Sequence, residues 1–241
     1  MKKDKGNSFM AQITIIIPTL NEEENVDFLL ERIFEVKDST GLDFNVLFVD
    51  SASVDKTCAC VKKWQRKRPV ELLQREVNVG LAPAVIAAAH TIDTDYMLVM
   101  DADLSHPPEK IPSILAPLLA DQCDMVIGSR YVKGGGTPDW PFSRKLSSKL
   151  ATLPALCFCS VKDPLAGFFA LKTKLITGLS SDVPGFKIGL AVLAQYHKQI
   201  RIKEIPIEFR DRDYGQSKMN QKVVFDYIRQ LGGLARWRMG L

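Results

Sequence analysis

The stretch Tyr96-Met97-Leu98-Val99-Met100-Asp101-Ala102-Asp103 decides how the chain can fold. It opens with an apolar run typical of a buried strand, and two carboxylates one residue apart follow directly. In an extended chain residues i and i+2 lie on the same face, so Asp101 and Asp103 should point the same way from the carboxyl end of that strand. Paired carboxylates repel each other, and a hard divalent cation, Mg²⁺ or Mn²⁺, relieves that repulsion.

An Asp-x-Asp pair alone is also typical of a polar turn. Its position at the end of a strand, followed by Ser105-His106-Pro107-Pro108, favours a metal site. We predict that Asp101, Asp103 and Ser105 hold the cation, with the hydroxyl as the weakest ligand. His106 is a lone histidine before two prolines, and we expect it to be packed rather than ligating.

Outward from this stretch, buried strands alternate with amphipathic helices. The expected strands are 13–17, 45–49, 70–74, 96–100 and 124–128. Such a series predicts an α/β fold with a mainly parallel sheet flanked by helices. Ligands bind these sheets outside the carboxyl ends of the strands. Four stretches follow strands and should converge on one crevice: 18–22, 50–53, 78–80 and 101–105.

The pattern changes after Gly128. We expect a flexible glycine-rich loop at 133–141, helices at 142–158 and 185–197, and strands at 167–171 and 201–209. Residues 223–241 predict a basic amphipathic helix, interrupted by Gly232-Gly233.

Composition narrows the class of protein. The 241 residues suit one large domain, and a net charge of +4 is too mild to indicate nucleic-acid binding. The five cysteines are odd in number and form Cys-x-Cys twice, so reduced thiols in a cytosolic setting are expected. No run of about 18 uncharged residues predicts a spanning helix.

Cationic residues gather later in the chain. Arg130 follows the strand at 124–128, and Arg144 opens the helix after the glycine-rich loop. Arginine suits bidentate contacts to phosphate, so we predict an anionic second substrate near the two aspartates. A solvated basic face is the alternative, and it explains the basic residues at 62–68 better.

With these residues in view, the chain resembles the inverting nucleotide-sugar glycosyltransferases of the GT-A fold. Within glycosyltransferase family 2 it is similar to the dolichol-phosphate mannose synthase group of polyprenyl-phosphate glycosyltransferases. The resemblance covers 13–231 and rests on eight motifs in order: IPTLNE at 17–22, VDSASVDKT at 49–57, NVGLA at 78–82, DADLSHPPE at 101–109, GSRYVKGGG at 128–136, DWPFSR at 139–144, GFKI at 185–188 and FRDRDYGQSK at 209–218.

The resemblance implies a role for each matching position. The donor nucleotide sugar would be held by Pro18, Leu20, Glu22, Val49, Asp50, Asp101, Ala102 and Asp103. The acceptor phosphate would be received by Arg130, Arg144 and Ser148, and both substrates would be closed over by Lys187, Arg212 and Ser217. Asp103, Arg130 and Arg144 would carry the catalysis. The chain departs from the family at Ser51, where a second Asp is usual, and at Ala191, where Glu is usual.

The implied reaction is metal-dependent transfer of a hexosyl group, with mannose from GDP-mannose expected, to a dolichyl-type phosphate with inversion. A phosphate acceptor is already anionic, so no general base is required. One alternative is transfer from UDP-glucose or another nucleotide sugar to undecaprenyl phosphate. A hydroxyl acceptor or a non-catalytic nucleotide-sugar-binding module would be other readings of the same fold.

The ends of the chain set its expected location. We divide it into an N-terminal extension (1–12), a GT-A domain (13–218) and a basic amphipathic interfacial helix (219–241). Apolar and basic side chains alternate in that helix, which suits an anionic lipid surface. We therefore expect a peripheral protein on the cytoplasmic face of a membrane, anchored if spanning helices follow. A terminal helix packed on the domain is the alternative.

Overall fold

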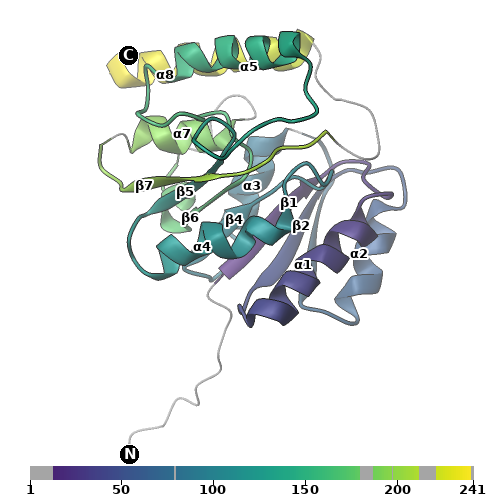
Figure 1. Cartoon of the computed structure of the whole chain (residues 1–241). Coiled ribbons are helices and arrows are strands. Elements are labelled where there is room, and N and C mark those ends of the chain that lie inside the picture. Colours follow the sequence, from purple (N-terminus) through teal and green to yellow (C-terminus); the bar gives the residue numbers. More distant parts are fainter. Residues whose placement is uncertain (1–12, 79, 180–186, 197, 212–220, 240–241) are drawn as a thin grey trace, which may run out of the picture.

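The computed structural model describes residues 13–78, 80–179, 187–196, 198–211 and 221–239, and shows one twisted sheet covered by helices (Figure 1). The seven strands follow the order β3-β2-β1-β4-β6-β5-β7. β6 runs antiparallel to both its neighbours, and the other pairs are parallel. This confirms the predicted α/β class. The strands are β1 (Ile13–Thr19), β2 (Asn45–Ser51), β3 (Val70–Arg75), β4 (Tyr96–Val99), β5 (Met125–Ser129), β6 (Phe169–Lys172) and β7 (Ile202–Pro206).

Two layers of helices bury the faces of the sheet. One face packs on α1 (Val26–Thr40), α2 (Thr57–Gln65) and α4 (Ile111–Leu119), which the short turn η1 (Pro108–Lys110) precedes. The other packs on α3 (Leu81–Ala89), α6 (Lys174–Thr177) and α7 (Ile188–Gln195). β1 shows why both faces are covered: Ile15 and Ile17 point into the first layer and Ile16 into the second, because side chains alternate along a strand.

A third layer lies beyond α7. α5 (Phe142–Ala155) and α8 (Gln221–Met239) lie side by side there (Figure 1). Leu234 of α8 packs with Ala155 and Phe158 and with Leu190 and Ala194 of α7. α8 is continuous through Gly232-Gly233, so the predicted interruption is wrong: helical hydrogen bonds do not depend on the missing side chains. No helix among the described residues is long and apolar enough to cross a bilayer.

The carboxyl ends of β1, β2 and β3 lie side by side at the same edge of the sheet. Thr19 pairs with Asp50, and Ser51 pairs with Arg75, so the loops after β1, β2 and β3 leave the sheet at one edge. β4 ends at Val99, one residue earlier than expected. The two aspartates therefore lie in a bend, with Leu104 at a φ of 63°, and the extended-strand argument for their common direction does not hold.

Candidate active site

The bend after β4 is built by its own polar side chains. Asp103 is 8% exposed, and its Oδ1 accepts hydrogen bonds from the Ser105 backbone N–H (3.2 Å) and hydroxyl (2.6 Å). The Asp101 side chain is more open, at 36% exposed. The Asp101 backbone N–H donates to Nδ1 of His106 at 2.9 Å. The bend thus combines a nearly buried carboxylate with a partly exposed one.

His106 is the packed residue that was expected. It is 2% exposed, stacks on Phe168 at 5.1 Å between ring centroids and meets Phe209 edge-on at 5.5 Å. Burial lowers the pKa of His106, although the charges of Asp101 and Asp103 act in the opposite direction. Since Nδ1 accepts a hydrogen bond, we assign the proton of the neutral ring to Nε2, which lies 3.9 Å from Asp101 Oδ2.

The oxygen atoms of this bend suit a hard cation. Two carboxylates and a hydroxyl are the donor types that Mg²⁺ and Mn²⁺ prefer. No group of three or more His, Cys, Asp or Glu side chains placed to hold a metal occurs among the described residues. Asp101, Asp103 and Ser105 would therefore supply only part of a coordination shell, and oxygens of a bound ligand or water would complete it.

The predicted nucleoside-binding residues Pro18 and Val49 pair near the carboxyl ends of β1 and β2. Asp50 is 1% exposed, and both its carboxylate oxygens accept from Ser53, from the backbone N–H at 2.9 Å and from the hydroxyl at 2.5 Å. Asn21, at a φ of 53°, donates its backbone N–H to the Ser53 hydroxyl and accepts from the Val54 N–H. Asn21 thus joins the loops that follow β1 and β2.

The other predicted donor contacts occupy the same edge. Leu20 and Glu22 follow β1 and are partly buried, and Ala102, between the two aspartates, is buried. Glu22 Oε2 accepts a hydrogen bond from the Asn25 amide at 2.8 Å, within the turn that starts α1. The structure therefore gathers these residues at one edge, while their roles toward a nucleotide stay predictions.

Arg130 is held by a buried carboxylate that the sequence reasoning missed. Asp163 is fully buried and accepts from the Arg130 backbone N–H (2.9 Å), Nε (2.8 Å) and Nη2 (2.7 Å). Burial alone would lower the pKa of Arg130, but the hydrogen bonds and charge of Asp163 raise it. Glu204 of β7 fixes Asp163 in turn, accepting the backbone N–H groups of Lys162 and Asp163. Arg130 therefore has one fixed, charged orientation.

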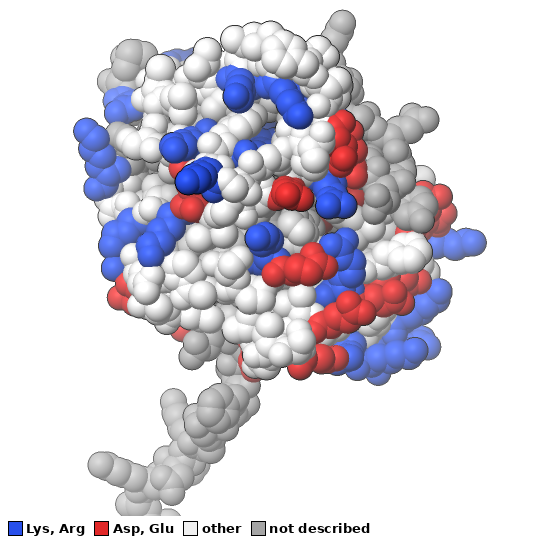
Figure 2. Space-filling model, viewed as in Figure 1, with Lys and Arg blue, Asp and Glu red and all other residues white. Residues whose placement is uncertain are grey.

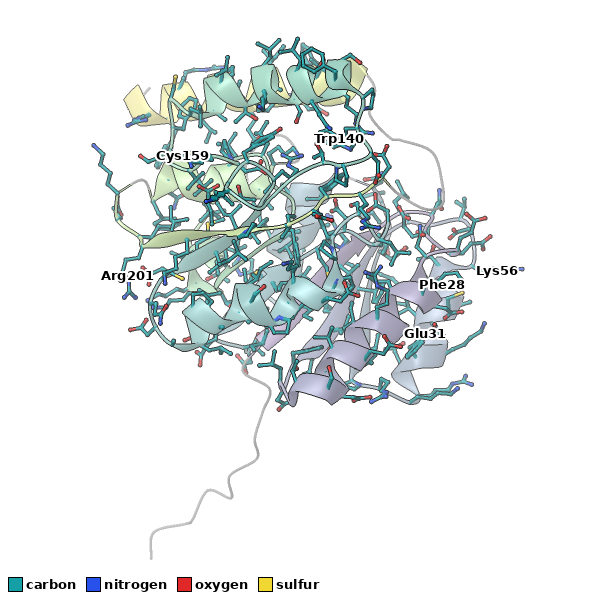
Figure 3. The ribbon with its side chains drawn as sticks, viewed as in Figure 1. Phe28, Glu31, Lys56, Trp140, Cys159 and Arg201 are labelled. Atoms are coloured by element: carbon teal, nitrogen blue, oxygen red, sulfur yellow. The ribbon has the colours of Figure 1, made fainter. Side chains whose placement is uncertain are left out.

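Arg144 has a different setting. Its guanidinium lies 4.1 Å above the ring of Trp140, and its Nη1 donates to Asp211 Oδ1 at 2.6 Å. Trp140 Nε1 donates to the same oxygen at 3.0 Å. In Figure 3, Trp140 lies between the α5–α8 layer and the sheet. Ser148, one turn further along α5, shares a hydrogen bond of 2.7 Å with the Tyr131 hydroxyl.

Aromatic rings connect the arginines to the aspartates. Phe209 packs edge-on against His106 and against Trp140, at 5.5 Å in each case. The Arg130 guanidinium lies 5.7 Å from the ring centroids of both Trp140 and Phe209. Backbone hydrogen bonds hold Phe209 between the loops, from its own N–H to Gly136 and from the Arg210 N–H to Ser105. Arg130 and Arg144 thus lie on the same side of the molecule as the acidic bend.

A large open cavity begins at this point. Its volume is about 980 Å³, and it extends from Arg130 and Trp140 along the side of α5. Its lining combines apolar side chains with three lysines, Lys145, Lys149 and Lys162. Gly135 and Gly136, at its rim, bond to Val132 and Ile207, so this loop is tied down and not free as predicted.

Lys187 joins the site from the start of α7. Its Nζ donates to the Leu165 carbonyl at 3.0 Å. Burial lowers the pKa of Lys187 to about 8; the charge of Arg130 contributes, and Asp101 and Asp163 oppose the shift. The predicted residues Arg212 and Ser217 lie outside the described residues. Trp140 and Asp211 were not among the predicted site residues, although both lie inside motifs that carry the family resemblance, at 139–144 and 209–218.

The sequence matches a known protein family and several named relatives. The model of the family described as Glycosyl transferase family 2 matches residues 14–179. A dolichol-phosphate mannosyltransferase from Pyrococcus furiosus is 38% identical over 94% of this chain, which spans 64% of that relative's length. The Saccharomyces cerevisiae protein of the same name is 30% identical, covering 95% of this chain and 89% of the relative.

Solved structures give the same fold. Glucosyl-3-phosphoglycerate synthase from Mycobacterium tuberculosis, in complex with Mn²⁺, UDP and glucosyl-3-phosphoglycerate, has a TM-score of 0.70 at 20% identity, covering 96% of this chain and 81% of that one. Its complex with Mg²⁺ and UDP has a TM-score of 0.67 at 22% identity. The fold is of the GT-A type. The chain belongs to glycosyl transferase family 2.

Proposed function

We propose that this protein transfers a hexosyl group, mannose from GDP-mannose, to a polyprenyl phosphate of the dolichyl type with inversion. The observation that carries the proposal is the aromatic bridge through His106, Phe209 and Trp140, which links the acidic bend to Arg130 and Arg144. Relatives named dolichol-phosphate mannosyltransferase support the choice of sugar and acceptor.

The residues of the site would contribute to the reaction mainly by positioning charged groups around the two substrates. Asp101, Asp103 and Ser105 would hold Mg²⁺ or Mn²⁺, which when bound neutralises the departing nucleoside diphosphate. Structures of M. tuberculosis glucosyl-3-phosphoglycerate synthase with Mn²⁺ and a uridine nucleotide support a divalent cation in this fold. Arg130 and Arg144 hold the acceptor phosphate close to the sugar despite the repulsion between the two anions. An oxygen of the acceptor phosphate attacks the anomeric carbon from the side opposite the leaving nucleoside diphosphate.

The cavity supports a lipid acceptor. Its apolar lining along α5 would accommodate hydrocarbon, while Lys145 and Lys149 suit the phosphate end. In Figure 2 the surface that α5 and α8 form is mostly uncharged, with basic side chains beside it. Apolar side chains are exposed on four residues of α5, on Leu156 directly after it and on four residues of α8: Phe142, Leu146, Leu150, Leu153, Leu156, Val224, Phe225, Ile228 and Trp237. This face would lie on the cytoplasmic surface of a membrane.

A panel of labelled sugar nucleotides tests the proposal. The protein is incubated with GDP-mannose, UDP-glucose or UDP-N-acetylglucosamine and with either dolichyl or undecaprenyl phosphate, with and without EDTA. We expect EDTA-sensitive transfer of label into the lipid phase from GDP-mannose. Transfer from UDP-glucose to undecaprenyl phosphate would support the alternative substrates. Nucleotide binding without any transfer or hydrolysis would identify a non-catalytic module and overturn the proposal.

A further inference from the structure

The two arginines differ in how firmly their carboxylate partners are held. Asp163 is fully buried and grips Arg130 through three hydrogen bonds. Asp211 makes one hydrogen bond to Arg144, and the two side chains are 44% and 43% exposed. An exposed ion pair with a single contact is weak, so another anion can replace it. Asp211 is therefore an exchangeable counter-ion, and Asp163 is a fixed one.

Arg144 does not depend on Asp211 for its position. The guanidinium carbon of Arg144 lies over the ring of Trp140, 4.1 Å from its centroid. Trp140 itself is 8% exposed and is held by Phe209. The indole N–H donates to the oxygen of Asp211 that Arg144 contacts. When Arg144 pairs with another anion, Trp140 can keep the Asp211 carboxylate within reach.

In the proposed reaction, the anion that replaces Asp211 at Arg144 changes its charge between acceptor and product. An oxygen of the acceptor phosphate forms a bond to the anomeric carbon, and the bond from that carbon to the nucleoside diphosphate breaks. The nucleoside diphosphate leaves with the electron pair, and no proton moves. The acceptor is a phosphate monoester with close to two negative charges at neutral pH. The lipid product is a phosphodiester with one negative charge, because the other leaves with the diphosphate.

We infer that Asp211 is an internal competing anion at Arg144 that limits how tightly this arginine holds the lipid product. A dianion attracts the guanidinium more strongly than one carboxylate does, so the monoester displaces Asp211. A diester carries the same charge as Asp211 and competes on nearly equal terms. After transfer, Asp211 pairs with Arg144 again and the product leaves. Asp211 thus promotes release of the product from the acceptor site, and this role rests on the proposed function.

The test compares Asp211→Asn with wild type and with Glu208→Gln. Asparagine removes the charge but keeps an oxygen that can accept from Trp140. Glu208 is exposed on the same segment and pairs with Arg210 at 3.6 Å, so its variant loses one negative charge without touching Arg144. Binding of farnesyl phosphate, a monoester, and of its methyl ester, a diester, is measured by calorimetry. Thermal unfolding and tryptophan fluorescence verify that each variant is folded.

In Asp211→Asn we expect both esters to bind up to about fivefold more tightly, because in the wild type each must displace the same carboxylate from Arg144. In turnover, inhibition by the lipid product should strengthen and kcat should fall without a rise in the KM for lipid phosphate. Unchanged affinity for both esters would overturn the inference, and so would an equal change in Glu208→Gln. Wild-type protein that binds neither ester would remove the proposed function as well, so the two failures can be told apart.

Discussion

Asp103 is where a single side chain should matter most for turnover. Its carboxylate is 8% exposed and receives two hydrogen bonds from Ser105, so it is oriented before any ligand binds. We expect Asp103→Ala to lower kcat by about 10²-fold or more while the melting temperature changes little, because charge stabilisation at the leaving group is lost. Radiolabel transfer and thermal unfolding check this. Near-normal turnover would remove the metal site from the mechanism.

Arg130 and Arg144 should respond differently to the same truncation. Arg130→Ala would leave the fully buried Asp163 without its guanidinium, at a cost of about 3–5 kcal/mol in the free energy of unfolding. Arg144→Ala removes an exposed pair, so stability should hold and the KM for lipid phosphate should rise. Urea unfolding measures the expected loss of stability in Arg130→Ala, and acceptor titration measures the expected rise in KM in Arg144→Ala. An effect of Arg144→Ala confined to the KM for the sugar nucleotide would contradict its assignment to the acceptor.

Lys187 gives the site a pH dependence in the alkaline range. Burial lowers its pKa to about 8, so the ammonium is lost as pH rises through that value, and we expect the affinity for the anionic donor to fall there. Since the unfolded-state pKa is higher, the cost of burying this charge is present below about pH 8 and is relieved up to about pH 10. As the pH rises above about 8, the free energy of unfolding should therefore increase while the affinity for the anionic donor falls.

The arginine variant separates this effect from general alkaline loss. Arginine stays charged throughout, so in Lys187→Arg the KM for the donor should remain nearly constant between about pH 7 and 9.5. Wild type and variant are compared by initial rates over that range, with melting temperatures as the control for folding. Parallel KM profiles in the two proteins would exclude Lys187 as the titrating group.

Among the elements, strands and helices with strong patterns were predictable and the connections were not. The apolar run before Asp101 gave β4 to within one residue, and the glycine-rich loop was recognised by composition. Periodicity carries no information on strand direction, so antiparallel β6 could not be foreseen. The partnership of Arg130 with Asp163 joins residues 33 positions apart and depends on where β7 places Glu204.

The loop between β5 and α5 is constrained at one glycine. A Cβ built on Gly135 would lie 2.4 Å from the Ser129 carbonyl oxygen, so Gly135→Ala must displace backbone that borders Arg130. We expect this variant to lose about 1–3 kcal/mol of stability and to weaken acceptor binding. Gly136→Ala is the matched control, because a Cβ there meets nothing within 4 Å. Equal behaviour of the two variants in urea unfolding and acceptor titration would contradict this account.

Across the whole molecule, one layer differs from the rest of the surface. α8 packs inward through Leu234, and Gln230 and Tyr227 donate to carbonyls of Lys187 and Ala151. Phe225 and Ile228 are exposed on the side of the helix away from Leu234, and Trp237 is exposed near the end of the helix, on its flank. The packed and interfacial readings of this helix are therefore compatible, because each uses a different side. The contacts of Leu234, Tyr227 and Gln230 with the domain hold α8 in one orientation, and this also fixes where its exposed apolar residues lie relative to the cavity.

Binding to vesicles tests the outward side of that layer. Phe225 is 65% exposed and Trp237 is 53% exposed, so each glutamate substitution should leave the fold intact while removing apolar contact with lipid. We expect Phe225→Glu or Trp237→Glu to weaken flotation with anionic vesicles by roughly tenfold, and to raise the KM for lipid phosphate but not for the sugar nucleotide. Leu119→Glu, on the exposed end of α4, is the control and should float as wild type does. Should wild-type protein fail to float at all, or should the α4 variant lose binding equally, the α5–α8 layer is not the lipid-facing surface, and the cavity along α5 must receive its acceptor from another direction.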